Sequence, residues 1–313
     1  MNQQQKTKKN NGILWGSLCT ILIVVAMIFV SEYIGEREVI FPETAALAVG
    51  LFLAPELPWR TDYLRLMLCI VLCAILGELI VLFVPTGLWI QLSFAYVLSQ
   101  LIYLYSGTTL APLISAIMLP VFIQTQGFVY PLAVLSLCTG LILLRALLVR
   151  KGIQKGTEYQ AVPLPGKLQF QNALFRCIAV ITLLYIALTF GVIFAVVPPL
   201  LVVFTELANP DHPARTRITS VIELVTICAL AGTFSRYYLG NTLGLPFYIA
   251  VIPAVLIMIL CMHLMKLYLP PAGAVLVLPF LLLSESSVMF YPAQVLIGTT
   301  VLVLVAWRLP QKR

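Results

Sequence analysis

Charge is what this sequence has least of. Only 10% of its 313 residues are Asp, Glu, Lys or Arg, and 61% are hydrophobic. A soluble domain has about 25% charged residues, so a water-soluble globular protein is excluded. The mean hydropathy is +1.03, and a run of about 20 apolar residues is long enough to cross a bilayer. The sequence therefore predicts an all-α polytopic membrane protein.

The motifs of soluble enzymes are missing as well. The chain has no GxGxxG, no GKS or GKT phosphate loop, no HExxH and no CxxC. Two His and no cluster of acidic residues leave little for hydrolysis or metal binding. The seven Cys fall within apolar stretches, where they are expected as small core residues. We therefore expect that the protein is not an enzyme and has no cofactor or metal site. A membrane enzyme acting on lipid ranks third, after the transporter and the scaffold considered below.

Pro, Gly and polar clusters divide the chain into about 12 apolar segments. One long hydrophilic connection, 150–169, separates them into two groups of six. We therefore expect a first six-segment membrane repeat at 1–149, a cytoplasmic linker at 150–169 and a second repeat at 170–313. The predicted segments are 12–31, 39–54, 64–84, 88–105, 108–123, 131–149, 171–189, 192–208, 217–239, 245–267, 270–284 and 292–307.

Lys and Arg are distributed unevenly once every segment is taken to cross the membrane. With the N-terminus in the cytoplasm, 17 of the 19 basic residues lie inside and only Arg37 and Arg236 lie outside. Cytoplasmic loops carry such an excess of Lys and Arg. We therefore expect a multi-pass protein of the plasma membrane with both termini in the cytoplasm. The net charge of +7 then reflects orientation, and no nucleic-acid partner is expected.

One polar phrase occurs twice, as PELPWRT at 55–61 and as PDHPART at 210–216. At this offset of 155, seven of the 23 positions from 55 to 77 are identical. Six crossings per half give parallel repeats, whereas five would give inverted ones, which the charge distribution disfavours. The sequence thus predicts two parallel six-segment repeats. Further pairs in the same order are Leu104-Tyr105 with Leu267-Tyr268, Leu119-Pro120 with Leu278-Pro279, and Tyr130-Pro131 with Tyr291-Pro292.

Two matching segments, 108–123 and 270–284, are short and interrupted by Pro. Short, Pro-interrupted segments at matching positions of two halves indicate a transporter's binding site. The free N–H groups at the ends of broken helices favour small anions. The alternative is a kinked helix whose freed backbone groups are satisfied by its neighbours. The candidate substrate-binding residues are Thr108, Thr109, Pro112, Pro270, Pro271, Ala272 and Gly273.

The second of these segments begins with Leu-Pro-Pro-Ala-Gly-Ala at 269–274. This stretch resembles the HPP family of integral membrane proteins, named for a His-Pro-Pro tripeptide that continues into Ala-Gly-Ala. The resemblance covers about residues 190–285, and Leu269 replaces the His of the family name. It implies a transporter-like protein, and nitrite transport is known for plastid members. The layout is also similar to the membrane portion of fusaric-acid and aromatic-acid exporters, a weaker match of architecture alone.

Ionisable residues inside membrane segments are costly and are therefore functional candidates. A carboxylate there can carry a coupling proton, or it can serve only to fix helix packing. A lone His near a helix end is likewise either a proton relay or a packed residue. The Arg of the two repeated phrases either follow the positive-inside rule or form an entrance that attracts anions. The candidates are Glu43, Glu78, Glu206, Glu223 and His263 for coupling, and Arg60 and Arg215 for the cytoplasmic entrance.

Together these features predict a membrane transporter for a small anion, either nitrite-like or a small organic or aromatic acid. Without an ATP-binding motif, either secondary transport or export driven by an ion gradient or a channel is expected. The expected partners are the lipid bilayer and the anionic substrate, and homo-oligomer formation stays open. The alternative is a non-transporting membrane scaffold or accessory subunit.

Overall fold

The computed structural model describes residues 3–156, 158–209, 212–282 and 285–308. Among them, eight helices are long and apolar enough to cross a membrane. The chain is therefore an α-helical, multi-pass membrane protein. The long helices are α1 (Gln3–Ile34), α3 (Tyr63–Phe83), α4 (Leu88–Tyr105), α6 (Val129–Arg150), α7 (Lys167–Thr189), α9 (Ile218–Phe234, continued by the π-helix η5, Ser235–Thr242), α10 (Phe247–Met265) and α12 (Glu285–Trp307).

Four further helices are short. A 12-residue helix is only about 18 Å long, against a hydrocarbon core of about 30 Å, so none of the four crosses by length alone. Of the predicted crossings, eight therefore have helices of sufficient length. The short helices are α2 (Glu43–Ala48, continued by the π-helix η2, Val49–Leu53), α5 (Pro112–Ile123), α8 (Pro198–Ala208, preceded by the 3₁₀ turn η3, Ile193–Val196) and α11 (Pro270–Leu281); two 3₁₀ turns, η1 (Arg37–Val39) and η4 (Pro213–Thr216), lie in loops.

Proline explains where the short helices begin. Pro112, Pro198 and Pro270 are the first residues of α5, α8 and α11, and Pro42 directly precedes α2. Pro is favoured at this position because its ring presets the helical φ, and the N–H it lacks would have no intrahelical partner there. Each short helix thus starts without one of the donors that an apolar interior would leave unsatisfied.

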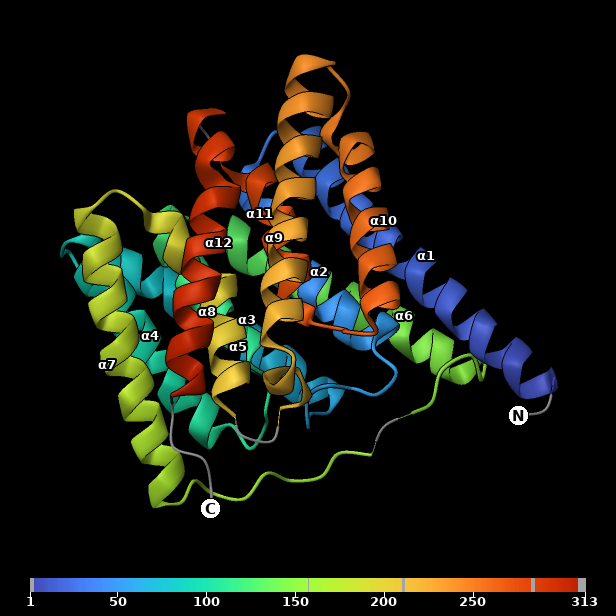
Figure 1. Cartoon of the computed structure of the whole chain (residues 1–313), viewed down its shortest axis with the longest axis horizontal. Coiled ribbons are helices and arrows are strands. Elements are labelled where there is room, and N and C mark those ends of the chain that lie inside the picture. Colours follow the sequence, from blue (N-terminus) through green and yellow to red (C-terminus); the bar gives the residue numbers. More distant parts are fainter. Residues whose placement is uncertain (1–2, 157, 210–211, 283–284, 309–313) are drawn as a thin grey trace.

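The short helices form the centre of the molecule, and the long helices surround them (Figure 1). Every residue of α8 and of α11 is buried. In the long helices only 33–44% of the residues in the apolar window are buried, so their outer faces remain apolar and exposed. Such faces suit lipid contact.

Helices before and after the linker pack in reciprocal pairs. α2 lies against α11, and α8 lies against α5; likewise α4 packs on α7, and α10 packs on α1. In Figure 1 the α4–α7 pair and the α1–α10 pair stand on opposite sides of the short helices. The two groups of six segments are therefore interleaved rather than separate bundles.

Two glycines allow matching close helix contacts in this core. A Cβ on Gly77 of α3 would lie 2.2 Å from the Ile117 carbonyl oxygen of α5, and a Cβ on Gly232 of α9 would lie 2.1 Å from that of Leu276 in α11. Two tyrosines fix the same helices. Tyr130 donates to the Ala116 carbonyl (3.2 Å) and Tyr291 to the Val275 carbonyl (2.8 Å). The contacts of α3 with α5 and of α9 with α11 thus have the same form.

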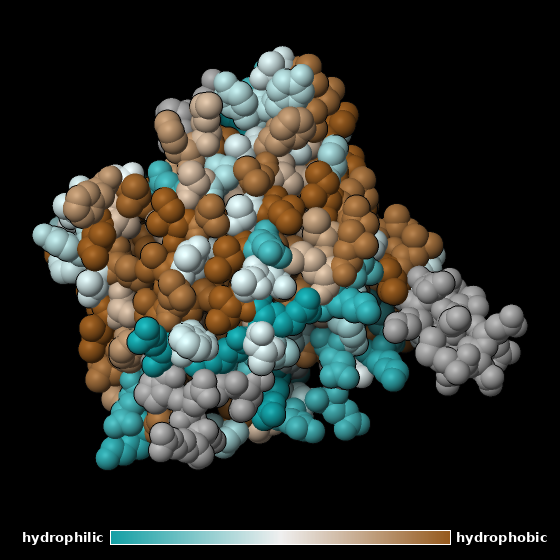
Figure 2. Space-filling view, in the orientation of Figure 1, coloured by the Kyte–Doolittle hydropathy of each residue, from teal (hydrophilic) through white to brown (hydrophobic). Residues whose placement is uncertain are grey.

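One end of the molecule is polar. In Figure 2 hydrophilic residues gather along the lower face, below a broad hydrophobic band. The linker between α6 and α7 runs along this face (Figure 1). Tyr159 holds the linker there, because its hydroxyl donates to the Gly107 carbonyl (2.7 Å) and its ring lies 4.0 Å from the Arg65 guanidinium.

We expect Gly77→Ala and Gly232→Ala each to lower the free energy of unfolding in detergent by about 1–3 kcal/mol, because a methyl group has no room against the facing carbonyl. Gly140→Ala is the matched control, since its Cβ would lie 3.5 Å from the Ile23 Cδ1 atom, an ordinary contact. Denaturant titrations of the three variants measure the effect. Equal stability of all three would contradict the helix contacts described above.

Candidate functional site

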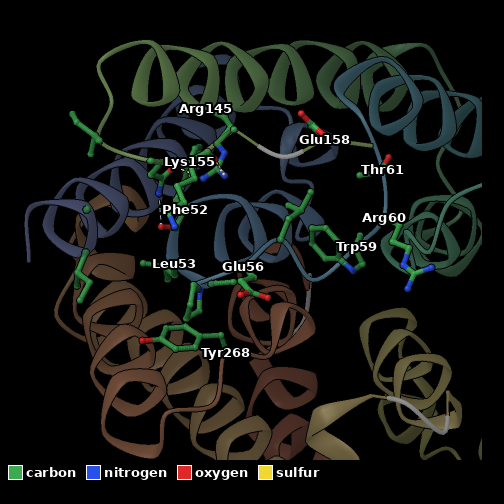
Figure 3. Close-up of a pocket in the computed structure, with 18 of the residues that line it drawn as sticks. Phe52, Leu53, Glu56, Trp59, Arg60, Thr61, Arg145, Lys155, Glu158 and Tyr268 are labelled. Carbon is green, nitrogen blue, oxygen red and sulfur yellow. Dashed lines mark hydrogen bonds between the residues drawn. The ribbon is translucent and has the colours of Figure 1, made fainter. Parts of the chain in front are cut away.

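A cavity of about 1500 Å³ opens on the polar face. It lies between the start of α1, the loop after η2, the end of α10 and the linker. Figure 3 shows Arg145 and Lys155 at one end of it and Trp59, Arg60 and Thr61 at the other. We call it the basic cavity, because its lining includes the basic residues Arg60, Arg145, Lys155 and Lys266 against the acidic residues Glu56 and Glu158.

Arg145 builds one wall of the basic cavity. Although α6 is otherwise apolar, this side chain is buried, at 8% exposure. It donates to the Leu51 carbonyl (2.5 Å), to the Lys155 carbonyl (2.9 Å) and to the Gln154 side chain. Gln154 in turn donates to the Phe52 carbonyl (2.9 Å). Arg145 and Gln154 therefore satisfy the Leu51 and Phe52 carbonyls of η2 and tie the linker to this element.

The two Arg of the repeated phrases have different positions. Arg60 lies at the basic cavity with an exposed side chain, while its backbone pairs with Thr109 through N–H to Oγ1 (2.9 Å) and O to N–H (3.3 Å). Arg215 is buried and donates to the carbonyls of Leu207 (3.1 Å) and Trp307 (3.2 Å). Of the predicted entrance pair, only Arg60 therefore lines a cavity, and Arg215 holds the ends of α8 and α12.

The predicted substrate-binding residues are not brought together. Gly273 packs against α2, where its Cβ would lie 2.9 Å from the Ala45 carbonyl group. Pro112 is likewise buried, at the start of α5. Thr108 and Thr109 line a second, smaller cavity on the polar face. The first residues of α11, Pro270, Pro271, Ala272 and Gly273, are buried and line neither cavity.

Glu43 lies deep in the centre, at the first position of α2. Its side chain is 1% exposed, and its Oε1 accepts a hydrogen bond from the Ser115 hydroxyl of α5. The other carboxylate oxygen, Oε2, is buried without a hydrogen-bond partner among the described residues. Glu43 thus links α2 to α5, and its Oε2 forms no hydrogen bond with a described residue.

Glu206, near the end of α8, is held by a residue of each repeated phrase. Its Oε1 accepts a hydrogen bond from Trp59 Nε1 (3.1 Å), and its Oε2 lies 4.0 Å from His212 Nε2. Burial lowers the pKa of His212, which favours the neutral imidazole beside this carboxylate. The two phrases therefore meet at one buried carboxylate.

The remaining ionisable candidates lie apart. Glu78 is buried near the opposite face and accepts a hydrogen bond from the Gly127 N–H (2.7 Å). Glu223 is exposed on the outer side of α9. His263 lines the basic cavity, with Nδ1 2.7 Å from the Ile259 carbonyl and Nε2 without a described partner. The predicted coupling residues therefore form no continuous relay in this structure.

Sequence reasoning missed several polar residues that the structure places in or beside these sites. Arg145 and Arg176 count toward the charge asymmetry of the sequence but are not among the predicted site residues. A charged residue well inside an apolar helix is the signal that identifies them. Trp59 and His212 belong to the two repeated phrases, which give no sign that they meet at Glu206. Among the described residues no group of three or more His, Cys, Asp or Glu is placed to hold a metal ion.

Comparisons of the chain with protein-family models, with curated proteins and with solved structures give no match. The resemblance to the HPP family therefore rests on the sequence pattern of about residues 190–285.

A double-mutant cycle on Trp59 and Glu206 tests their hydrogen bond. Trp59→Phe removes the donor and leaves a buried carboxylate oxygen unpaired, so we expect a loss of stability that Glu206→Leu largely cancels. The coupling between the two substitutions should be about 1–3 kcal/mol, measured by denaturant unfolding in detergent. Simple additivity of the two single effects would show that the bond contributes nothing.

Glu38, in the loop before α2, gives a prediction for pH dependence. Burial raises the pKa of Glu38, and the nearby Glu78 carboxylate raises it further. A raised pKa penalises the charged form in the folded state, so stability is lost as pH rises through it. Glu38→Gln should therefore stabilise the protein more at pH 7.5 than at pH 4.5, as measured by thermal unfolding. If Glu38→Gln raised the unfolding temperature equally at both pH values, the gain would not come from the raised pKa of Glu38.

Proposed function

We propose that the protein transports a small anion, either nitrite-like or a small organic or aromatic acid, by secondary transport or export. The observation that carries this proposal is the basic cavity. Four basic side chains against two acidic ones give its lining a positive balance. A cleft lined by one sign of charge concentrates ions of the opposite sign and raises their rate of entry. The cavity would thus serve as the cytoplasmic entrance.

We also propose that the chain is a duplication, with α1–α6 and α7–α12 as parallel repeats of six helical segments. The reciprocal packing of α2 on α11 and of α8 on α5 supports this arrangement. The matched contacts of Gly77 with Ile117 and of Gly232 with Leu276 support it as well. Parallel repeats place both polar phrases on one face, which the positive-inside rule assigns to the cytoplasm of a plasma-membrane protein.

The short helices are the barrier in this proposal. α2 and α11 touch closely at Ala45 and Gly273, and all described residues of α8 and α11 are buried. Passage of an anion therefore requires these helices to move apart. The same close packing favours the second candidate function, a membrane scaffold or accessory subunit, which needs no open state.

Uptake into proteoliposomes tests the transport proposal. Reconstituted protein should take up nitrite or small carboxylates faster than protein-free vesicles do. The double variant Lys155→Gln, Lys266→Gln removes two exposed charges of the basic cavity, so uptake should fall about threefold to tenfold at low ionic strength and less at high salt. Arg150→Gln is the matched control, because Arg150 is an exposed charge on α6 outside the cavity lining.

Two results would contradict the proposal. If no anion enters faster than in protein-free vesicles, transport fails and the scaffold function is favoured. If Arg150→Gln slows uptake as much as the double variant does, the cavity is not the entrance.

A further inference from the structure

A second cavity, of about 190 Å³, lies on the polar face between the ends of α4 and α8 and the first turns of α7. The linker residues Val162, Pro163 and Pro165 form its cover. We call it the Arg176 cavity, after the one charged residue among those that line it. Its polar lining comprises Tyr103, Thr108, Thr109, Asn172, Arg176 and Thr205, together with Gln169 and Asn209 near the rim.

Arg176 is buried within α7, with 6% of its surface exposed. Its Nε donates to Gln100 Oε1 of α4 (2.9 Å). No hydrogen bond joins its two terminal nitrogens to another described residue, and neither nitrogen is fully enclosed. Since Arg176 lines the cavity, these nitrogens are available there as a planar pair of donors.

The charge of Arg176 has no acidic partner among the described residues. No carboxylate of a described residue lines the cavity, and the neighbouring Glu206 interacts with Trp59 and His212 instead. A buried charge without a counter-charge is strongly destabilising unless something compensates it. A bound anion would supply the missing charge.

Other donors lie near this guanidinium. Thr109 Oγ1 accepts the Arg60 N–H, which leaves its hydroxyl proton free to donate. Asn172 is buried at the cavity with no hydrogen bond to a described residue. Gln100 Nε2, next to Arg176, is fully buried and lacks a partner. The unused donors of Thr109 and Asn172 and one fixed positive charge therefore line the same small volume, and Gln100 lies outside this lining.

We propose that the Arg176 cavity binds one small monocarboxylate, with the carboxylate on the guanidinium of Arg176. Arg pairs with a carboxylate through two parallel hydrogen bonds, because its planar fork matches the two oxygens. The lining also has an apolar part, with Leu104, Val162 and Pro163, which suits a short hydrocarbon chain or a single ring. The volume is below that of sites for drug-sized molecules, about 300–1000 Å³. The binding claim stands independently of transport, and the cavity is the substrate site only if the proposed function holds.

The position of this cavity mirrors that of the basic cavity. If α7 corresponds to α1, α8 to α2 with η2, and α4 to α10, the two cavities lie at matching places of the two repeats. The match of Leu104-Tyr105 with Leu267-Tyr268 then pairs Gln100 with His263. The amide nitrogen Nε2 of Gln100 and the ring nitrogen Nε2 of His263 both lack a hydrogen-bond partner among the described residues. The duplicated framework thus presents two cavities of related construction, of which the smaller contains the unpaired buried Arg.

Ligand-dependent thermal unfolding of the full-length protein in detergent tests the proposal. Sodium butyrate and sodium benzoate, titrated at constant ionic strength, should raise the unfolding midpoint of the wild type in a saturable way, because a ligand that binds only the folded state stabilises it. Arg176→Gln should need at least a tenfold higher concentration for the same shift. Arg150→Gln, an equal loss of charge on the same face, should respond like the wild type.

Asn172→Ala provides a second variant, since Asn172 lines the cavity and forms no hydrogen bond with a described residue. It should weaken the response about threefold, and it preserves the test if Arg176→Gln does not fold. No saturable shift with either carboxylate, or equal shifts in wild type and both variants, would overturn the proposal. A stronger response to sodium nitrite than to the carboxylates would overturn the assigned ligand class. Binding without uptake would reject transport and leave this site intact.

Discussion

The structure depends on satisfying the ends of four short helices inside an apolar protein. Backbone N–H and C=O groups without partners are costly where no water can reach them. At the helix starts, Pro42, Pro112, Pro198 and Pro270 solve part of the problem by removing a donor or presetting the first turn. At the other ends, buried arginines supply donors: Arg145 to the Leu51 carbonyl of η2 and Arg215 to the Leu207 carbonyl of α8.

This constraint explains why two of the arginines are buried. Arg145 and Arg215 are occupied by helix carbonyls, and their burial therefore has a structural reason. Arg176 is buried to a similar degree but uses only Nε for a bond with a described residue. Arg145 and Arg215 thus support the backbone, whereas Arg176 has terminal nitrogens that can bind a ligand in the cavity under the linker.

The sequence predicted the α-helical membrane class, because long apolar runs are a local signal, and eight of the twelve predicted segments correspond to helices long enough to cross. The start of α11 at Pro270 follows from the same local reasoning. The site was less predictable. The meeting of Trp59 with Glu206, 147 residues apart, and the exposure of Glu223 depend on which helix faces which. Thr108 and Thr109 were selected as part of a broken helix, yet the structure places them beside Arg176, in a cavity that no local pattern indicates.

The most direct measurement is an electron cryo-microscopy map of the protein in lipid nanodiscs with a saturating concentration of 4-bromobenzoate. The account predicts density for the carboxylate within hydrogen-bond distance of the Arg176 guanidinium, with the ring against Leu104 and Val162 under the linker. A well-resolved map in which this cavity holds no ligand, or in which the guanidinium pairs with a carboxylate of the protein itself, would contradict it.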